Sequence, residues 1–315
     1  MDLYCIGEML IDFIPGSEPG SYIRHAGGAP ANVAIAAAKN GLSAGMNCSV
    51  GDDDFGRFLL ETLTAHGVRR INPGLCRDAV TTMAFVSLSP DGDRSFTFVR
   101  KPGADQFLAE ENVREADIAD AAVVHGGSCS LSAAPENAAT VKALRLGHEL
   151  GKLVSFDVNY RDMMWNGDRN ACRDMILTCL PFVDLLKLSE EEAELFGGEA
   201  ALPELMERNR IALLVETLGS EGARAFFAGK VLSVPGRKAV CVDATGAGDA
   251  FWGALLSFLL LQGVRKPADL TEETVRSALE YGNTAGWLCV QGKGAIPSLP
   301  TRAEIEQHIS GGFRS

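Results

Sequence analysis

The residues that could carry out chemistry stand out first in a glycine-rich turn in the last quarter of the chain. The run at 238–260 reads KAVCVDATGAGDAFWGALLSFLL, and its pattern predicts a strand over 239–242, a tight turn over 245–248 and a helix from Asp249 onward. A turn of small residues that opens a helix directs several backbone N–H groups, and the positive end of the helix dipole, at one point. This arrangement predicts a binding site for an anion such as a phosphate group.

Asp249 lies in the first turn of that expected helix. A carboxylate there can serve simply as a cap or as a partner of the helix dipole. Beside an anion site it also meets the requirement for transfer of a phosphoryl group to a hydroxyl. The carboxylate accepts the alcohol proton while the N–H groups stabilise the charge on the phosphate. The setting of strand, turn and helix favours this second interpretation.

A second candidate motif lies near the N-terminus, in the run GGAPANVA at 27–34. Gly27 and Gly28 allow the backbone to approach a ligand closely, and Asn32 offers both a donor and an acceptor on a helix that opens after Pro30. A hinge at the glycines and a capping role for Asn32 would explain the same residues without a ligand.

The elements that must position these motifs alternate along the chain. Short apolar runs are followed by helical stretches, which is typical of a parallel sheet covered on both faces. The expected strands lie at 121–125, 152–158, 182–188 and 211–217, and the expected helices at 135–150, 171–180 and 190–196. The sequence therefore predicts a doubly wound α/β fold with a mostly parallel sheet, whose ligands bind at the carboxyl ends of the strands.

Two segments, 11–24 and 81–100, depart from this alternation. The second reads as two strands joined by a tight turn at 89–93, which is typical of a β-hairpin. Neither segment is followed by a helix that would place it in the parallel sheet, so we expect a small β-sheet lid rather than surface decoration. The expected domains are an α/β core of 1–11, 25–80 and 101–315, and a lid of 12–24 and 81–100.

Composition excludes several classes of protein. The 315 residues include 29 Lys and Arg against 41 Asp and Glu, a formal net charge of −12, which argues against a general binder of nucleic acids or anionic membranes. No apolar run reaches the ~20 residues that span a bilayer, and the longest, 250–261, reads as a buried helix. No leader-like start is visible, so we expect a cytoplasmic location. The 8 cysteines form no C-x-x-C pair, which favours buried free thiols over zinc sites or disulfides.

The run DATGAGDAF at 243–251 resembles the C-terminal signature of the ribokinase-like sugar kinases, the PfkB family. The run at 27–34 resembles the N-terminal signature of that family, and the similarity covers nearly the whole chain, lid strands included. The resemblance implies an enzyme that uses ATP and Mg²⁺ to phosphorylate a primary hydroxyl, usually of a sugar or nucleoside. It also implies that Asp249 is the catalytic base and that the anion hole consists of Gly246, Ala247 and Gly248.

The same resemblance assigns residues to the sugar. Asn32 would bind sugar hydroxyls, and Gly27 and Gly28 would link the lid to the core. Asp12, at the end of an early strand, matches the family's other hydroxyl-binding carboxylate. On its own Asp12 reads as a solvated charge at a strand end.

Nucleotide-binding residues are also implied by the family pattern. The run TLGSEG at 217–222 follows an expected strand, and in the family this loop lies against the nucleotide. The resulting candidates for nucleotide binding are Lys187, Thr217, Gly219, Gly222 and Asn283.

Two cation sites complete what the resemblance implies. The family carries an Asn-x-x-Glu motif whose Glu orders the magnesium-bound phosphates; here Ser189 replaces the Asn, and Glu192 is the expected magnesium residue, acting through water. The spacing of these two residues is equally that of a helix capping box. A monovalent cation, K⁺, is expected at Asp243 and at the carbonyl of Thr245, although Asp243 could simply cap the turn.

The acceptor is indicated by three further runs. GEMLIDFIP at 7–15, RKPGAD at 100–105 and FDVNYR at 156–161, with Trp165 beyond, resemble bacterial and plant fructokinases. They imply that Arg100 and Arg161 bind the substrate, although both read alternatively as surface charges. Guanidinium groups at a lid exit and a strand end are well placed to bind hydroxyls or phosphates. The expected reaction is conversion of D-fructose to fructose 6-phosphate.

Other functions remain open at this point. Kinases of 2-keto-3-deoxygluconate and of aminoimidazole riboside share much of the pattern. A sugar-binding sensor without turnover would have lost its base, whereas Asp249 is present. A dinucleotide-binding dehydrogenase would need Gly-x-Gly-x-x-Gly after the first strand, which is absent. We expect no nucleic acid or membrane partner, and a homodimer that forms through the lid.

Overall fold

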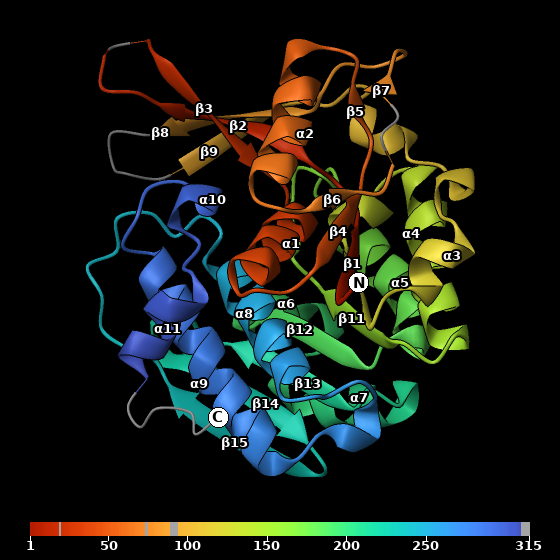
Figure 1. The fold of residues 1–315 in the computed structure, drawn as a ribbon, viewed down its shortest axis with the longest axis vertical. Helices are drawn as coiled ribbons and strands as arrows, with labels where there is room; N and C mark the ends of the chain where they lie inside the picture. Colours follow the sequence, from red (N-terminus) through yellow and green to blue (C-terminus); the bar gives the residue numbers. More distant parts are fainter. Residues whose placement is uncertain (19, 73–74, 89–93, 310–315) are drawn as a thin grey trace.

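The computed structural model describes residues 1–18, 20–72, 75–88 and 94–309. Its centre is a nine-stranded sheet in the order β15-β14-β13-β12-β11-β10-β1-β4-β6 (Figure 1). The strands are β1 (Leu3–Ile6), β4 (Ala44–Asn47), β6 (Arg69–Arg70), β10 (Val123–Gly127), β11 (Leu153–Asp157), β12 (Leu185–Ser189), β13 (Leu213–Thr217), β14 (Gly222–Phe227) and β15 (Lys230–Pro235). All neighbours from β13 to β6 pair in parallel, and β14 and β15 add an antiparallel edge. The mostly parallel sheet is confirmed.

Helices cover both faces of this sheet, which confirms the doubly wound fold. Side chains of β1 alternate between two apolar cores: Leu3 and Cys5 face one, Tyr4 and Ile6 the other. The first core is covered by α1 (Ala29–Lys39), α2 (Asp54–Ala65), α8 (Ala247–Leu261), α9 (Glu272–Cys289) and α11 (Arg302–His308). The second is covered by α3 (Glu115–Ala119), α4 (Glu136–Glu149), α5 (Arg169–Cys179), α6 (Glu190–Ala193) and α7 (Leu202–Asn209).

The apolar run at 250–261 lies in α8, which packs between α1 and α9. A helix that is hydrophobic on all sides is expected to be buried, and most of α8 is. Gly253 allows the close approach to α1, because a Cβ at this position would stand 2.6 Å from Cβ of Ala36. Among the described helices, none is both long and apolar enough to cross a membrane.

A separate four-stranded sheet, in the order β3-β2-β8-β9, lies at one end of the main sheet, at the upper left of Figure 1. Its strands are β2 (Leu10–Pro15), β3 (Tyr22–Gly27), β8 (Met83–Leu88) and β9 (Arg94–Val99). Phe13 of β2 stacks on Phe85 of β8 with ring centroids 4.6 Å apart, and meets Phe55 of α2 edge-on at 5.6 Å. Two aromatic contacts thus hold the sheet together and against the core.

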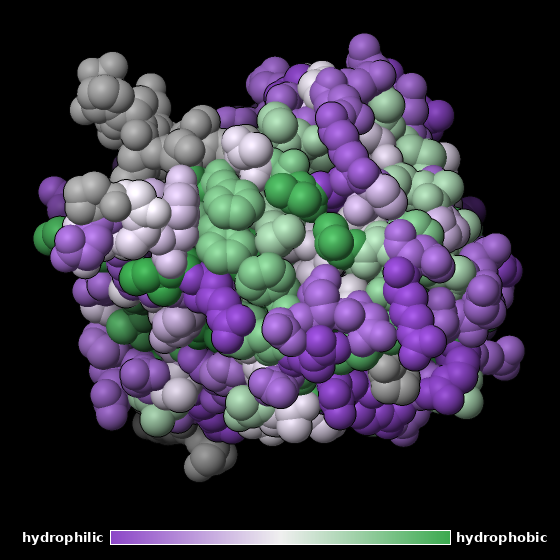
Figure 2. All heavy atoms as spheres, turned by 90° about the horizontal axis from the view of Figure 1, so that it is seen from above, coloured by the Kyte–Doolittle hydropathy of each residue, from purple (hydrophilic) through white to green (hydrophobic). Residues whose placement is uncertain are grey.

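The small sheet confirms the expected fold class, and its pairing explains how the segments at 11–24 and 81–100 meet. β2 pairs antiparallel with β3, β8 pairs antiparallel with β9, and β2 and β8 join the two hairpins in parallel. The tight turn predicted at 89–93 lies outside the described residues. The domain boundaries and the role of this sheet as a lid stay predictions. Figure 2 looks onto this end of the molecule and shows hydrophobic residues gathered among hydrophilic ones.

Three expectations about local structure were wrong. Residues 239–242 form no strand: Val240 is 84% exposed, and the N–H groups of Val242 and Asp243 donate to the carbonyl of Val290 at the end of α9. An apolar run becomes a strand only where a neighbouring strand accepts its hydrogen bonds, and this connection from β15 to α8 has none. The expected strand at 182–188 begins only at Leu185, where β12 starts, since Leu180–Phe182 is a 3₁₀ turn. The helix expected at 190–196 is an α-helix only over Glu190–Ala193, and Glu194–Phe196 is a 3₁₀ turn.

The remaining elements are short and connect these layers. A two-stranded sheet pairs β5 (Val50–Gly51) with β7 (Leu75–Cys76), and α10 (Ala295–Ser298) follows α9. Six of the eight cysteines are buried, as expected, whereas Cys76 is half-buried and Cys241 is exposed.

Candidate active site

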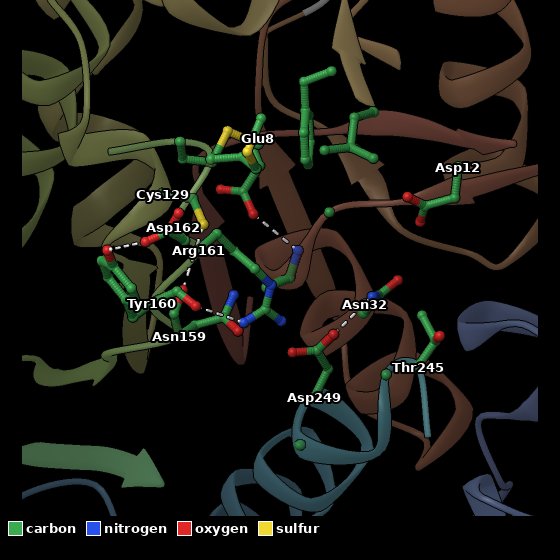
Figure 3. A pocket seen from close by; sticks show the side chains of 18 of the residues that line it. Glu8, Asp12, Asn32, Cys129, Asn159, Tyr160, Arg161, Asp162, Thr245 and Asp249 are labelled. Carbon is green, nitrogen blue, oxygen red and sulfur yellow. Dashed lines mark hydrogen bonds between the residues drawn. The ribbon is translucent and has the colours of Figure 1, made fainter. Parts of the chain in front are cut away.

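A cavity of about 580 Å³ lies between the carboxyl ends of the main-sheet strands and the small sheet (Figure 3). It brings the two sequence motifs together. The predicted site residues that line it are Asp12, Gly28, Asn32, Arg161, Thr245, Gly246, Gly248 and Asp249. Residues after β1, β10 and β11 contribute as well, as expected for ligands of a doubly wound sheet.

Asn32 and Asp249 are the contact between the motifs. The side-chain amide of Asn32, near the start of α1, donates to Oδ2 of Asp249 in the first turn of α8 at 2.7 Å, although the residues are 217 positions apart. Both are buried. Burial raises the pKa of Asp249 above its usual range, while the Asn32 hydrogen bond opposes that rise. The carbonyl oxygen Oδ1 of Asn32 is buried without a partner, which leaves an acceptor for a ligand.

The turn that opens α8 has the form expected of an anion site. Gly246 caps the helix with a positive φ of 79°, and a Cβ there would stand 2.6 Å from Cβ of Ala295. Only glycine combines this conformation with this contact. The N–H groups of Gly248 and Asp249 lie in the first helical turn, where no intrahelical acceptor exists. A Cβ at Gly248 would stand 3.4 Å from Nζ of Lys187, so a buried cation lies against the same turn.

Lys187 is bonded to one buried carboxylate, Asp157, and lies near a second, Glu192. Its Nζ lies 2.9 Å from both oxygens of Asp157. Burial raises the pKa of Glu192, and the nearby positive charge of Lys187 opposes that rise. The two oxygens of Glu192 accept from the N–H groups of Tyr160, at 2.6 Å, and Ser189, at 2.8 Å. The capping box is therefore present, and the expected role of Glu192 toward magnesium stays a prediction.

A second cavity of about 340 Å³ adjoins the first, and Ala244 and Gly248 line both. It brings together the predicted nucleotide residues of the loop after β13 with Asn283 of α9. Gly222 has a φ of 104°, and a Cβ there would collide with the carbonyl of Val234. The predicted residues that line this cavity are Thr217, Gly219, Gly222, Ala247, Gly248 and Asn283.

Two side chains predicted to contact the nucleotide are already engaged. Asn283 donates to the carbonyl of Val234 at 3.1 Å, which ties α9 to the end of β15. Thr217 donates to the carbonyl of Leu188 at 3.4 Å. A further wall of the cavity is formed by Trp287 of α9, over which the Arg237 guanidinium lies at 5.8 Å.

Asp243 organises the loop before α8. Its Oδ1 accepts from the N–H and the hydroxyl of Thr245, at 2.9 and 2.7 Å, and its Oδ2 accepts from the N–H of Gly294 at 2.9 Å. These bonds fit the capping interpretation, so the monovalent cation at Asp243 and Thr245 stays a prediction. Nowhere among the described residues do three or more His, Cys, Asp or Glu side chains form a group that could hold a metal ion.

Two of the residues predicted to bind the substrate, Arg100 and Gly27, do not line the first cavity. Arg100 is buried and donates to Asp105 at 2.7 Å, to Ser132 at 3.0 Å and to Glu136 at 3.2 Å. Its guanidinium is thus already bonded within the core, and its expected role toward the substrate stays a prediction. Gly27 does not line the cavity either, but a Cβ there would collide with the carboxylate of Asp12.

Several lining residues were not singled out in the sequence. They are Glu8, Leu10, Ala29, Phe98, Cys129, Asn159, Tyr160, Asp162, Met163, Met164 and Ala244. Glu8 follows β1 and Asn159 follows β11, so position after a strand was the available signal. Asn159 also has a positive φ of 37°, a conformation that Asn tolerates better than most residues.

Comparison with known proteins gives a consistent result. The model of the pfkB family carbohydrate kinases matches residues 1–302. The chain is 38% identical to Fructokinase-1 of Zea mays over 314 residues, which covers 96% of both chains. It is 31% identical to the Xylella fastidiosa fructokinase solved with bound ATP, with a TM-score of 0.88 and 96% of each chain covered.

Two further solved structures are similar. The fructokinase of Vibrio cholerae O395, bound to fructose, ADP and a calcium ion, is 31% identical with a TM-score of 0.85, and 96% of this chain and 97% of that chain are covered. The aminoimidazole riboside kinase of Salmonella enterica, bound to aminoimidazole riboside and an ATP analogue, is 28% identical with the same TM-score, and 98% and 99% are covered.

The buried ion pair of Lys187 with Asp157, next to Glu192, generates a first prediction. The substitution Lys187→Met leaves Asp157 and Glu192 without their cation, which lowers the free energy of unfolding by about 3–5 kcal/mol at pH 8. Because Lys187 lowers the pKa of Glu192, the variant raises that already raised pKa further. A carboxyl group whose pKa is higher in the folded state binds protons more readily there, so stability falls as pH rises. The deficit is therefore smaller at pH 5.

Urea unfolding at pH 5 and pH 8 measures this deficit. Lys230→Met is the matched control, because it removes the cation of an exposed pair with Glu272 and changes stability little. A Lys187→Met deficit that is the same at both pH values, or no larger than that of the control, contradicts the prediction.

Proposed function

The chain belongs to the pfkB family of carbohydrate kinases, and on that premise we propose that it transfers the γ-phosphate of ATP to the primary 6-hydroxyl of D-fructose. The products are fructose 6-phosphate and ADP. The observation that carries the proposal is the position of Asp249. It lines the first cavity, here called the sugar-side cavity, and accepts a hydrogen bond from Asn32. Its neighbour Gly248 lines both this cavity and the second one. A base and an anion site thus meet where two ligands would touch.

The proposed chemistry is a single displacement. The oxygen of the acceptor hydroxyl attacks the γ-phosphorus, the bond to the bridging oxygen of ADP breaks, and Asp249 takes the hydroxyl proton. Burial raises the pKa of Asp249, and a more basic carboxylate accepts a proton more readily. The N–H groups at the start of α8, with Lys187 behind Gly248, would stabilise negative charge on the transferring phosphoryl group.

The proposed sugar site is rich in acceptors. Asp12 and Asn32 line the cavity beside Asp249, and burial raises the pKa of Asp12 to about 7. Buried hydrogen-bond acceptors that lack a donor are well suited to bind a ligand with several hydroxyl groups. Arg161 extends its guanidinium into the same cavity (Figure 3) and is the proposed donor to sugar oxygens.

The choice of D-fructose is supported by the relatives. Fructokinase-1 and Fructokinase-2 of Zea mays are 38% and 39% identical to this chain. A Vibrio cholerae fructokinase was solved with fructose and ADP. The alternative assignments, as a kinase of aminoimidazole riboside or of 2-keto-3-deoxygluconate, are not favoured.

ATP is proposed to occupy the second cavity, against Thr217, Gly219, Gly222 and Asn283. Bound Mg²⁺ would neutralise phosphate charge, with Glu192 ordering its water ligands. K⁺ is proposed at Asp243 and the carbonyl of Thr245; a Vibrio cholerae double mutant was solved in a fructose-, ADP- and potassium-bound form. The oxygen atoms of these residues are of the type that such cations prefer.

Two further expectations are kept as proposals. The homodimer through the lid would use β3, where Tyr22 and Ile23 are about half exposed, and sedimentation velocity measures it. A cytoplasmic location is checked by fractionation of cells that express the chain.

The small sheet is proposed to close over the sugar and to exclude water, which would otherwise accept the phosphoryl group. Hydrogen exchange with and without saturating D-fructose measures this. We expect slower exchange in β2 (Leu10–Pro15) and β8 (Met83–Leu88), with α7 (Leu202–Asn209) unchanged as an internal control. Equal exchange in both states of the small sheet removes closure from the mechanism.

The substitution Asp249→Asn tests the base. It keeps the size of the side chain and an oxygen that can accept from Asn32, but cannot take the proton, so kcat falls by about 10²–10⁴ while ATP binding is kept. Asp168→Asn is the matched control, because Asp168 caps α5 and Asn caps equally well. Retention of more than about a tenth of wild-type kcat contradicts the assignment.

A comparison of acceptors tests the substrate. An ADP-release assay gives kcat/KM for D-fructose, D-ribose, 2-keto-3-deoxygluconate and aminoimidazole riboside, and D-fructose is expected to have the highest value. If another acceptor exceeds it tenfold, about 1.4 kcal/mol of transition-state binding, the fructokinase assignment fails while the family assignment stands.

A further inference from the structure

Glu8 is a buried carboxylate with one oxygen left over. It lies between β1 and β2, is 3% exposed, and lines the sugar-side cavity. Its Oε1 accepts a hydrogen bond from the N–H of Ala29 at 3.0 Å, which caps the start of α1. Its Oε2 is buried and accepts none. Capping therefore explains one oxygen of Glu8 and leaves the other unexplained.

The charged groups around Glu8 do not neutralise it directly. Arg100 is the nearby cation, but its guanidinium is bonded to Asp105 and Glu136. Burial raises the pKa of Glu8 to about 7; the backbone N–H groups of Glu8 itself and of Ala29, and the charge of Arg100, oppose this rise, and Asp105 adds to it. Glu8 in turn helps to raise the pKa of Cys129, another cavity residue. The carboxylate thus has an unmet need for a donor.

Because Glu8 is one of the residues that line the sugar-side cavity, a ligand bound there can supply the missing donor. A buried acceptor without a partner costs about 1–3 kcal/mol, and such a cost is offset where a ligand hydroxyl donates to it. Figure 3 shows Glu8 and Asp249 on different sides of the cavity, with the Arg161 guanidinium between them in this view. Glu8 therefore faces a part of the ligand that is removed from the reacting hydroxyl.

We propose that Glu8 determines acceptor specificity: its Oε2 accepts a hydrogen bond from one hydroxyl of the sugar, away from the hydroxyl that is phosphorylated. This inference rests on the proposed function. It adds a selection against acidic acceptors, because a carboxylate at that place in the ligand would meet the oxygen of Glu8 instead of a donor. The class of ligand that fits is a neutral polyol with a hydroxyl remote from its reacting end.

The test is a double-mutant cycle in which one change is a substitution in the enzyme and the other is the removal of a hydroxyl from the substrate. Glu8→Gln keeps an oxygen that can cap α1 through Ala29 and places an NH₂ donor where Oε2 stood. Kinetics are measured for wild type and variant with D-fructose and with its 1-, 3- and 4-deoxy analogues. The variant is expected to lose about 10- to 100-fold in kcat/KM for D-fructose, chiefly through KM, with KM for ATP unchanged.

The decisive readout is coupling to a single hydroxyl. For one of the deoxy analogues, the kcat/KM of the wild type is expected to fall by about the same factor as Glu8→Gln loses with D-fructose. With that analogue Glu8→Gln lowers kcat/KM little further, because the sugar hydroxyl that bonds to Glu8 is already missing. With the other analogues the two losses multiply. Losses that multiply for every analogue, or an unchanged kcat/KM for D-fructose in the variant, overturn the proposal.

Glu136→Gln is the matched control. Glu136 is equally buried, accepts from Arg100 and has an unpartnered Oε1, but it does not line the cavity. Its variant is expected to keep wild-type kcat/KM for D-fructose, and a loss equal to that of Glu8→Gln overturns a direct contact. If Glu8→Gln does not fold, Glu8→Asp, which withdraws the oxygen by one methylene, enters the same cycle. If the wild-type enzyme does not phosphorylate D-fructose, the proposed function fails. This outcome is measured without any variant, so it is distinguishable from failure of the Glu8 proposal.

Discussion

The site depends on one constraint: two helices must begin at the same place while being buried along most of their length. α1 and α8 both start at the cavity and pack against each other, with Gly253 lying against Ala36. The hydrogen bond from Asn32 to Asp249 is possible only because that packing aligns their first turns. The apolar composition of α8 is therefore as much a part of the site as the aspartate, because it fixes where the helix N-terminus stands.

Burial sets the electrostatics of this region. Asp157, Lys187, Glu192 and Asp249 come from four elements. Burial raises the pKa of both Glu192 and Asp249; the charge of Asp157 adds to each rise, and that of Lys187 opposes it. Lys187 is bonded within this group to Asp157, and it stands next to the glycine turn. A buried ion pair contributes little to stability by itself. Its consequence here is positional, since a fully held ammonium needs no rearrangement when an anion arrives.

What the sequence could predict was local. The turn at Gly246 and the pair Gly27–Gly28 can be recognised in the sequence, because small residues there allow the backbone to approach a ligand or a neighbouring element closely. The alternating apolar runs indicate a doubly wound sheet. Two partners of the Arg100 guanidinium could not be predicted, because Ser132 and Glu136 lie 32 and 36 residues further along the chain. The connection at 239–242 has the composition of a strand but no neighbour to pair with, and neighbours are decided by topology. Glu8 lay within a quoted run, yet only the fold shows that one of its oxygens lacks a donor.

The two cavities share Ala244 and Gly248, and this narrow common boundary has a consequence for how such a chain can change over generations. Residues on the acceptor side come from β2, α1 and the segment after β11, whereas the other side is built by the loop after β13 and by α9. Apart from α8 and the residues just before it, the two cavities are therefore lined by different elements. Such an arrangement allows the acceptor pocket to change while the pocket for the phosphoryl donor is kept, so one scaffold can accommodate different acceptors.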